Sequence, residues 1–286
     1  MGKYSGILFA SDFDHTLSGL DGKIPPQNID AIRAFMDEGG CFTISSGRSV
    51  ELLRQKVAAI PVNAPCICFN GAACYDYAAE KLFYAQPLPD NAREILEAAF
   101  AFDKRLFAEV QRIGEHYVFN GGTVRDTFLK TDGVTPIHAE GEIPLPWMKI
   151  VLCDPDATTL HEPAAMVPQE TMDYMNRLRE HMLAACGDTC YVTRSLPRVI
   201  EIGAADSNKG ASTRRLMREL GLHTLVCAGD APNDLEMLLE ADISFAPADC
   251  DATIRALPNV HLTVPCGEGC VADAIGQLDG LLGNAG

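Results

Sequence analysis

Residues 7–10 form an apolar run of strand length, and two carboxylates, Asp12 and Asp14, follow it at once. In an extended segment residues i and i+2 point to the same side, so this pair starts out close together at the end of a buried strand. Two like charges at that separation repel unless a proton or a cation lies between them. A hard divalent ion such as Mg²⁺, which prefers oxygen ligands, meets this need. A solvated turn explains the pair more simply when it is taken alone, so the rest of the chain must decide.

Strand and helix patterns alternate through the first 85 residues. After the first strand, the sequence predicts a helix over 27–38, a strand over 41–44, a helix over 49–59 and a strand over 65–69. Short links between alternating strands and helices are typical of a parallel sheet that is covered on both faces. The same alternation returns from residue 207. The chain is therefore predicted to have an α/β fold with a Rossmann-like parallel sheet.

The middle of the chain has a different pattern, in which hairpins and helices follow one another without the regular alternation. This order predicts a separate α+β domain that is inserted into the first one. We place the boundaries so that 1–85 and 203–286 form one domain and 86–202 form the inserted domain.

Composition excludes several classes of partner. The formal net charge of −16 argues against a nucleic-acid partner and against adsorption to an anionic membrane surface. No apolar run approaches the length of a transmembrane helix, and we expect no signal peptide because the first residues lead straight into a strand. The eleven cysteines are an odd number without zinc-type spacing, so we expect reduced, buried thiols in a cytoplasmic protein.

Polar clusters occur where predicted parallel strands end or where a helix begins. In open α/β sheets, ligands bind in the crevice outside the carboxyl ends of the strands, so clusters far apart in sequence can meet there. Four clusters have this position: Asp12/Asp14/Thr16, Ser46-Gly47-Arg48, Lys209, and Asp230/Asn233/Asp234.

The chemistry of these clusters is complementary. Asp12, Asp14, Asp230 and Asp234 can supply the ligands of a hard cation. Asp12 can also attack phosphorus and form an aspartyl phosphate, while Asp14 can protonate the leaving alcohol and then take a proton from water.

The remaining groups suit a phosphate. Ser46 and the backbone N–H groups near Gly47, at a helix N-terminus, can hold phosphoryl oxygens. Lys209 is a point charge that can neutralise both the phosphoryl group and an otherwise over-acidic pocket.

This combination resembles the haloacid dehalogenase (HAD) superfamily of Mg²⁺-dependent phosphohydrolases. The matching segments are DFDHT, SSGR, the lysine of SNKG, and GDAPND. Their order and spacing are similar to those of the Cof-type branch, which carries a large C2 (type IIB-like) cap between the second and third motifs. FNGA at 69–72 adds to the likeness. The resemblance implies that 1–85 and 203–286 form the catalytic core and that 86–202 form the cap.

The resemblance also implies a role for each matching position. Asp12 is implied as the nucleophile and a Mg²⁺ ligand, and Asp14 as the acid/base that binds Mg²⁺ through its carbonyl. Ser46, Gly47 and Lys209 are implied to bind the phosphoryl group. Asp230 is implied as a Mg²⁺ ligand, with Asn233 and Asp234 supporting it; of these two we expect Asn233 to reach the phosphoryl group and Asp234 the metal. His15 departs from the family, which usually has Gly there, and it either alters the turn or places an imidazole near the site.

Three functions compete on this evidence. The first is Mg²⁺-dependent hydrolysis of a small phosphomonoester, with a sugar phosphate as the favoured substrate class. The second is a phosphomutase or phosphotransferase that uses the same aspartyl phosphate. The third is a non-hydrolytic switch protein that keeps its phosphorylated aspartate, although such domains need neither this chain length nor an inserted cap.

Overall fold

A computed structural model describes residues 2–121, 124–160 and 166–283 of the chain. Contacts divide the chain into two compact units. The first unit comprises Met1–Gly47, Lys56–Tyr84 and Lys209–Gly286, and the second comprises Arg48–Gln55 and Ala85–Asn208. The predicted division differs mainly in the segments 48–55 and 203–208, both of which lie with the second unit. The assignment of catalytic core and cap to these parts of the chain stays a prediction.

A five-stranded parallel sheet with the order β14-β13-β12-β1-β2 forms the centre of the first unit. Ser11, the last residue of β1, pairs with Ala228 on one side and with Ile44 on the other, so the carboxyl ends of three strands are level. The predicted parallel α/β fold is confirmed. The strands are β1 (Ile7–Ser11), β2 (Cys41–Ile44), β12 (Thr224–Ala228), β13 (Ile243–Pro247) and β14 (Val260–Thr263).

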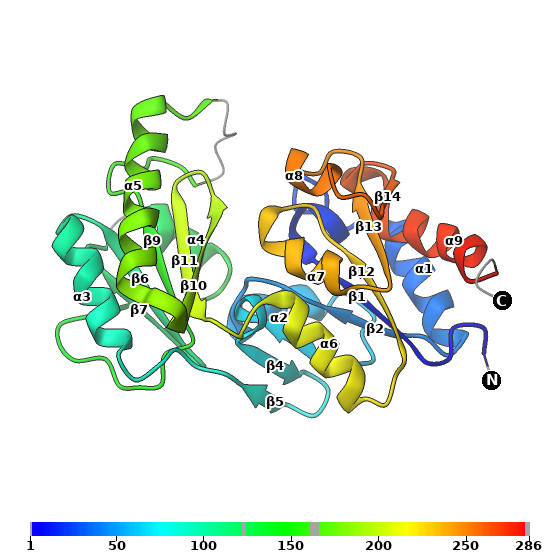
Figure 1. Cartoon of the computed structure of the whole chain (residues 1–286). Coiled ribbons are helices and arrows are strands. Elements are labelled where there is room, and N and C mark those ends of the chain that lie inside the picture. The colour runs from blue at the N-terminus through cyan, green and yellow to red at the C-terminus, as the bar shows by residue number, and fades with distance from the viewer. Residues whose placement is uncertain (1, 122–123, 161–165, 284–286) are drawn as a thin grey trace. The chain divides into compact units, whose positions relative to one another are not determined.

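Apolar residues on both faces of β1 are buried, which explains its uninterrupted apolar run. Leu8 packs in a cluster with residues of α6 and α7, and Phe9 on the opposite face stacks on Phe245 with a centroid separation of 6.4 Å. Helices α6 and α7 lie side by side, as do α1 and α9 (Figure 1). The helices are α1 (Pro26–Asp37), α6 (Lys209–Glu219), α7 (Leu235–Glu240), α8 (Ala252–Arg255) and α9 (Cys270–Gly283). A small three-stranded sheet contains β3 (Cys66–Cys68), β4 (Ala73–Asp76) and β5 (Lys81–Ala85).

The second unit is built on a six-stranded sheet with the order β10-β11-β9-β6-β7-β8. All described neighbours pair antiparallel except β7 and β8. This is the α+β pattern that the sequence predicted for the inserted part. The strands are β6 (Phe107–Arg112), β7 (Glu115–Phe119), β8 (Ile137–His138), β9 (Lys149–Cys153), β10 (Cys190–Leu196) and β11 (Val199–Ala204), and the helices are α2 (Val50–Val57), α3 (Ala92–Phe102), α4 (Val124–Thr131) and α5 (Gln169–Cys186).

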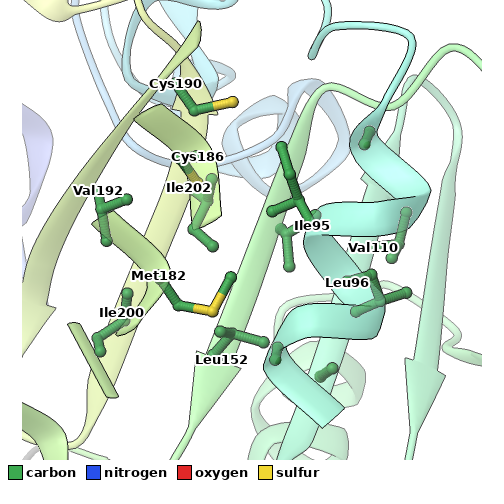
Figure 2. Packing of buried hydrophobic residues seen from close by; sticks show 14 of the residues in the cluster. Ile95, Leu96, Val110, Leu152, Met182, Cys186, Cys190, Val192, Ile200 and Ile202 are labelled. Atoms are coloured by element: carbon green, nitrogen blue, oxygen red, sulfur yellow. The ribbon is translucent and has the colours of Figure 1, made fainter. Parts of the chain in front are cut away.

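One face of this sheet carries the main apolar core of the second unit. Figure 2 shows Ile95 of α3 and Met182 of α5 gathered with Leu152 and Ile202 of the sheet in one cluster of buried side chains. Successive strand residues point to opposite faces, so every second residue of β9 and β11 enters this core. Burial of each such side chain stabilises the fold by about 1.5–3 kcal/mol.

The opposite face of the same sheet carries a buried ion-pair network. Glu109 is fully buried, and its two carboxylate oxygens contact Nδ1 of His116 and Nε of Arg125, each at 2.6 Å. His116 also contacts Oγ of Ser49 through its Nε2, at 2.9 Å. The side chain of Leu52 lies in an apolar cluster beside this network. The start of α2 is therefore held by the second unit.

Within the part of the chain that the structure describes, no helix is long and apolar enough to cross a membrane. All eleven cysteines are free, and nine of them are buried.

Candidate active site

The first candidate segment follows β1 directly. The backbone N–H of Asp12 donates to the carbonyl of Ala228 at 2.9 Å, which extends the pairing of β1 and β12 by one residue. A tight turn over Phe13–Leu17 follows, in which His15 has φ 62° and ψ 14°. This left-handed conformation is uncommon for residues other than glycine. The structure therefore shows the turn that the sequence left open, with a histidine in a conformation that glycine adopts without strain.

Lys209 lies at the centre of the site. It is the first residue of α6, its side chain is fully buried, and its ammonium donates to Oδ1 of Asp12 and Oδ1 of Asp234, both at 2.6 Å. The residues that form this contact are separated by up to 222 positions in sequence, and the level ends of β1 and β12 bring them together. Burial acts to lower the pKa of Lys209, but the two carboxylates outweigh it and raise that pKa.

The loop after β12 supplies two more carboxylates. Oδ2 of Asp234 accepts the backbone N–H groups of Asp230 and Ala231, at 3.0 and 3.1 Å. Oδ1 of Asp230 accepts the hydroxyl of Thr16 at 2.8 Å, so the turn after β1 and the loop after β12 are tied together. Thr16 belongs to the first polar cluster, and its hydroxyl proves to be a direct link within the site.

Asp12, Asp230 and Asp234 form a cluster that fits a metal ion, because one carboxylate oxygen from each lies within 4.8 Å of the others. Burial, together with the like charges of Asp234 and Asp14, raises the pKa of Asp12 to about 7. The ammonium of Lys209 acts in the opposite direction but does not outweigh them. Burial and the charge of Asp12 also raise the pKa of Asp230 well above its ordinary value. One lysine does not compensate the cluster, and a hard divalent cation would lower both pKa values.

Asp14 has a different position from the other carboxylates. Its side chain is half-buried, its charge raises the pKa of Asp12, and it is not a member of the three-carboxylate cluster that the described residues form.

Ser46 and Gly47 follow the neighbouring strand β2. The backbone N–H of Ser45 donates to the carbonyl of Ser11 at 2.9 Å, and Ser46 lies two residues beyond Ile44, which is level with the last residue of β1. Ser46 is buried, and its own N–H donates to the carbonyl of Ile67 at 2.9 Å. The predicted phosphate-binding segment therefore lies at the same sheet edge as Asp12.

Asn70 lies in the FNGA segment that adds to the family likeness, but the sequence analysis assigned this residue no role. Its side-chain oxygen accepts Nδ2 of Asn233 at 3.3 Å, and its backbone N–H donates to the carbonyl of Ser46 at 3.0 Å. An Asn-Gly pair after a strand was the available signal, but such a pair indicates a turn and not a site.

Comparison with known proteins identifies the family. The family model described as haloacid dehalogenase-like hydrolase matches residues 9–275. A protein named HMP-PP phosphatase from Klebsiella pneumoniae (strain 342) is 24% identical over 262 residues, which cover 91% of this chain and 90% of that protein. The pyridoxal phosphate phosphatase YbhA of Escherichia coli (strain K12) is 22% identical, over 88% of this chain and 92% of its own length.

Solved structures agree with this result at the level of the fold. A haloacid dehalogenase-like hydrolase from Bacteroides thetaiotaomicron matches with a TM-score of 0.78 at 18% identity, covering 96% of this chain and all of that chain. A sugar phosphatase of HAD subclass IIB matches with a TM-score of 0.74 at 18% identity, covering 95% and 98%. The resemblance seen in the motifs is confirmed. Because the family model matches nearly the whole length of this chain, the chain belongs to the haloacid dehalogenase-like hydrolases.

Proposed function

We propose that this hydrolase removes the phosphoryl group from a small phosphomonoester in a Mg²⁺-dependent reaction, with sugar phosphates as the first substrate class. The observation that carries the proposal is the buried ammonium of Lys209 between Asp12 and Asp234 at the edge of the parallel sheet. A buried cation among several carboxylates is suited to a reaction in which a dianion enters and leaves. The relatives named above act on HMP-PP and on pyridoxal phosphate, which supports a small phosphate ester.

The residues have the following proposed roles. Asp12 attacks phosphorus, so that a new O–P bond forms while the bond to the leaving oxygen breaks. Asp14 gives its proton to that leaving oxygen, and in the second step it takes a proton from the water that attacks the aspartyl phosphate. The second step releases inorganic phosphate and restores both carboxyl groups. Ser46, Gly47 and Asn233 hold the phosphoryl oxygens, and Lys209 balances their charge.

Asp12 and Asp230 are the side chains that we propose for the Mg²⁺ site, together with the backbone carbonyl of Asp14. When bound, the ion supplies positive charge that stabilises the phosphoryl oxygens. Both carboxylate oxygens of Asp234 already accept hydrogen bonds, one from Lys209 and the other from two backbone N–H groups. This favours a supporting role for Asp234 over direct coordination.

The cytoplasm is the location that fits this proposal. All eleven cysteines are free thiols, including pairs that are close in sequence such as Cys66 and Cys68. A reducing compartment keeps such thiols in this state.

The test is phosphate release from a panel of phosphomonoesters, with and without Mg²⁺, by the wild type and by Asp12→Asn. We expect Mg²⁺-dependent release that is abolished in Asp12→Asn. The matched control is Asp76→Asn, because Asp76 lies outside the carboxylate cluster and an asparagine there can still accept the N–H groups of Ala78 and Ala79. Near-normal release by Asp12→Asn would refute the nucleophile. Retention of labelled phosphate on Asp12 without release would favour the phosphomutase or the switch protein.

A further inference from the structure

Asn70 occupies an unusual stretch of backbone. It follows β3 in the segment Phe69–Gly71, where three successive residues have positive φ angles of 53°, 55° and 110°. Phe69 and Asn70 are not glycines, and Asn70 is only 2% exposed. Such a conformation persists only where the surrounding structure holds it, and it is concentrated near functional sites.

Two contacts of Asn70 lead to the two predicted phosphate-binding loops. Its side-chain oxygen accepts Nδ2 of Asn233, at 3.3 Å, from the loop after β12. Its backbone N–H donates to the carbonyl of Ser46, at 3.0 Å, in the loop after β2.

The side chain of Asn70 also lies directly against Gly47. A Cβ atom added to Gly47 would be 2.7 Å from the side-chain oxygen of Asn70, which is closer than real Cβ contacts allow. The absence of a side chain at position 47 is thus what lets the amide of Asn70 approach this loop. One residue contacts both loops, which are more than 180 positions apart in the sequence.

We propose that Asn70 is a positioning residue for phosphate binding, which fixes the amide of Asn233 and the Ser46-Gly47 loop relative to each other. This inference rests on the proposed function. A carboxamide nitrogen has two N–H groups. When Asn70 accepts one of them, the Asn233 amide is fixed about its last torsion, and its second N–H has a defined direction for a phosphoryl oxygen.

The residue type suits this task. Asparagine tolerates the left-handed backbone better than most residues other than glycine. Its side-chain oxygen is a neutral acceptor, whereas a carboxylate in the same place would bring a negative charge next to a phosphate dianion.

The principal test variant is Asn70→Gly, because glycine removes the side chain while it keeps the positive φ angle without strain. The probe is inorganic phosphate, whose inhibition constant is measured in the presence of Mg²⁺ beside KM and kcat for the best substrate of the panel. We expect phosphate binding to weaken about 10-fold or more and KM to rise by a similar factor, since an ordered donor to a charged group is lost. We expect kcat to change much less.

A matched control distinguishes a positioning role of Asn70 from a purely structural one. Asn120 also has a left-handed backbone, with φ 52°, and its amide nitrogen donates to the carbonyls of Lys104 and Leu106, both at 2.8 Å. Asn120→Gly should lower the melting temperature without a change in the inhibition constant of phosphate. If both variants lower the melting temperature alike and neither alters phosphate binding, Asn70 is only structural and the inference is wrong.

A double-mutant cycle with Asn233→Ala tests whether Asn70 acts through Asn233. We expect the double variant to bind phosphate only slightly more weakly than the weaker of the two single variants, because the two changes remove one shared arrangement. Effects that multiply would refute the coupling.

The proposed function and the positioning inference can be refuted independently. If Asp12→Asn keeps its activity, the proposed function is refuted. If Asp12→Asn is inactive while Asn70→Gly binds phosphate as the wild type does, only the positioning inference is refuted.

Discussion

Among the described residues, Lys209 is the only cation that forms ion pairs with the cluster of Asp12, Asp230 and Asp234. Its replacement by methionine removes this positive charge and leaves a side chain of similar length. In the wild type the ammonium lies 2.6 Å from Asp12 and 2.6 Å from Asp234, and all three side chains are buried. In Lys209→Met the carboxylates of Asp12, Asp230 and Asp234 face one another without compensation. The folded protein must then tolerate their repulsion or bind an additional proton.

The loss of folding stability can be estimated for each of these two cases, repulsion and protonation. With oxygens within 4.8 Å of one another, two ionised carboxylates repel by about 3.5 kcal/mol at an effective dielectric constant of 20. Protonation of one carboxylate costs about 1.4 kcal/mol for each pH unit above the ordinary pKa of aspartate, which amounts to about 5.5 kcal/mol at pH 8 and about 2 kcal/mol at pH 5.5. We therefore expect the free energy of unfolding to fall by about 3.5–5.5 kcal/mol at pH 8. This range overlaps that measured when one partner of a buried ion pair is removed.

The pH dependence has a definite sign. Loss of the ammonium raises the pKa values of Asp12 and Asp230 further, so the folded variant binds more protons than the unfolded chain near neutral pH. Stability is then lost as the pH rises. The defect of Lys209→Met should accordingly shrink as the pH is lowered from 8 to 5.5.

Denaturant unfolding at pH 8 and pH 5.5, with and without Mg²⁺, measures these effects. A cation in the cluster stabilises the folded state by about 2.7 kcal/mol at a concentration of 100 Kd, and the variant should gain more than the wild type because its cluster is more negative. Lys149→Met is the matched control, since Lys149 is equally buried and pairs with Glu201 in the second unit. Its defect should not respond to Mg²⁺. A Lys209→Met defect that is independent of both pH and Mg²⁺ would refute the electrostatic reasoning.

Three further changes test other parts of the structure. His15→Gly should raise the free energy of unfolding by about 1 kcal/mol in denaturant titrations, because glycine relieves the left-handed backbone; a clear loss would mean that the imidazole stabilises the turn. His116→Gln should cost about 1.5–3 kcal/mol below pH 6.5, where the wild-type imidazolium bridges Glu109 and Ser49. Burial acts to lower the pKa of His116, but Glu109 and Glu51 outweigh it and raise that pKa. The stability that the imidazolium charge provides is therefore lost as the pH rises through the pKa of His116 in the folded protein. An equal defect from pH 5.5 to pH 9 would contradict this. Gly47→Ala should lower kcat/KM at least about 10-fold, because its Cβ would collide with Asn70; unchanged steady-state kinetics would show that the loop adapts freely.

The sequence was sufficient to predict which polar residues meet. Asp12, Lys209 and Asp234 each follow a predicted strand or begin a helix, and the carboxyl ends of parallel strands share one edge of a sheet. That rule needs only the order of the elements. It therefore anticipated that these side chains lie together, and the structure shows them in contact through the ion pairs of Lys209.

Asn70 shows what that rule leaves out. Its role depends on a positive φ angle and on a contact with Asn233, and neither has a signature in apolar periodicity. The Asn-Gly pair predicts a turn equally well on any exposed loop. Which way the amide of a turn residue points is decided by the surrounding packing, so such residues become visible only in three dimensions.

The segment 48–55 illustrates the same limit on a larger scale. Its pattern is part of the predicted helix over 49–59, and α2 begins at Val50; a helix after a strand in an α/β domain is expected to cover that sheet. Instead Arg48 forms an ion pair with Asp132, Ser49 contacts His116, and Leu52 enters an apolar cluster of the second unit. Periodicity shows which face of a helix is apolar but not which surface receives that face. The chain consequently passes from one compact unit to the other immediately after the proposed phosphate-binding residues Ser46 and Gly47.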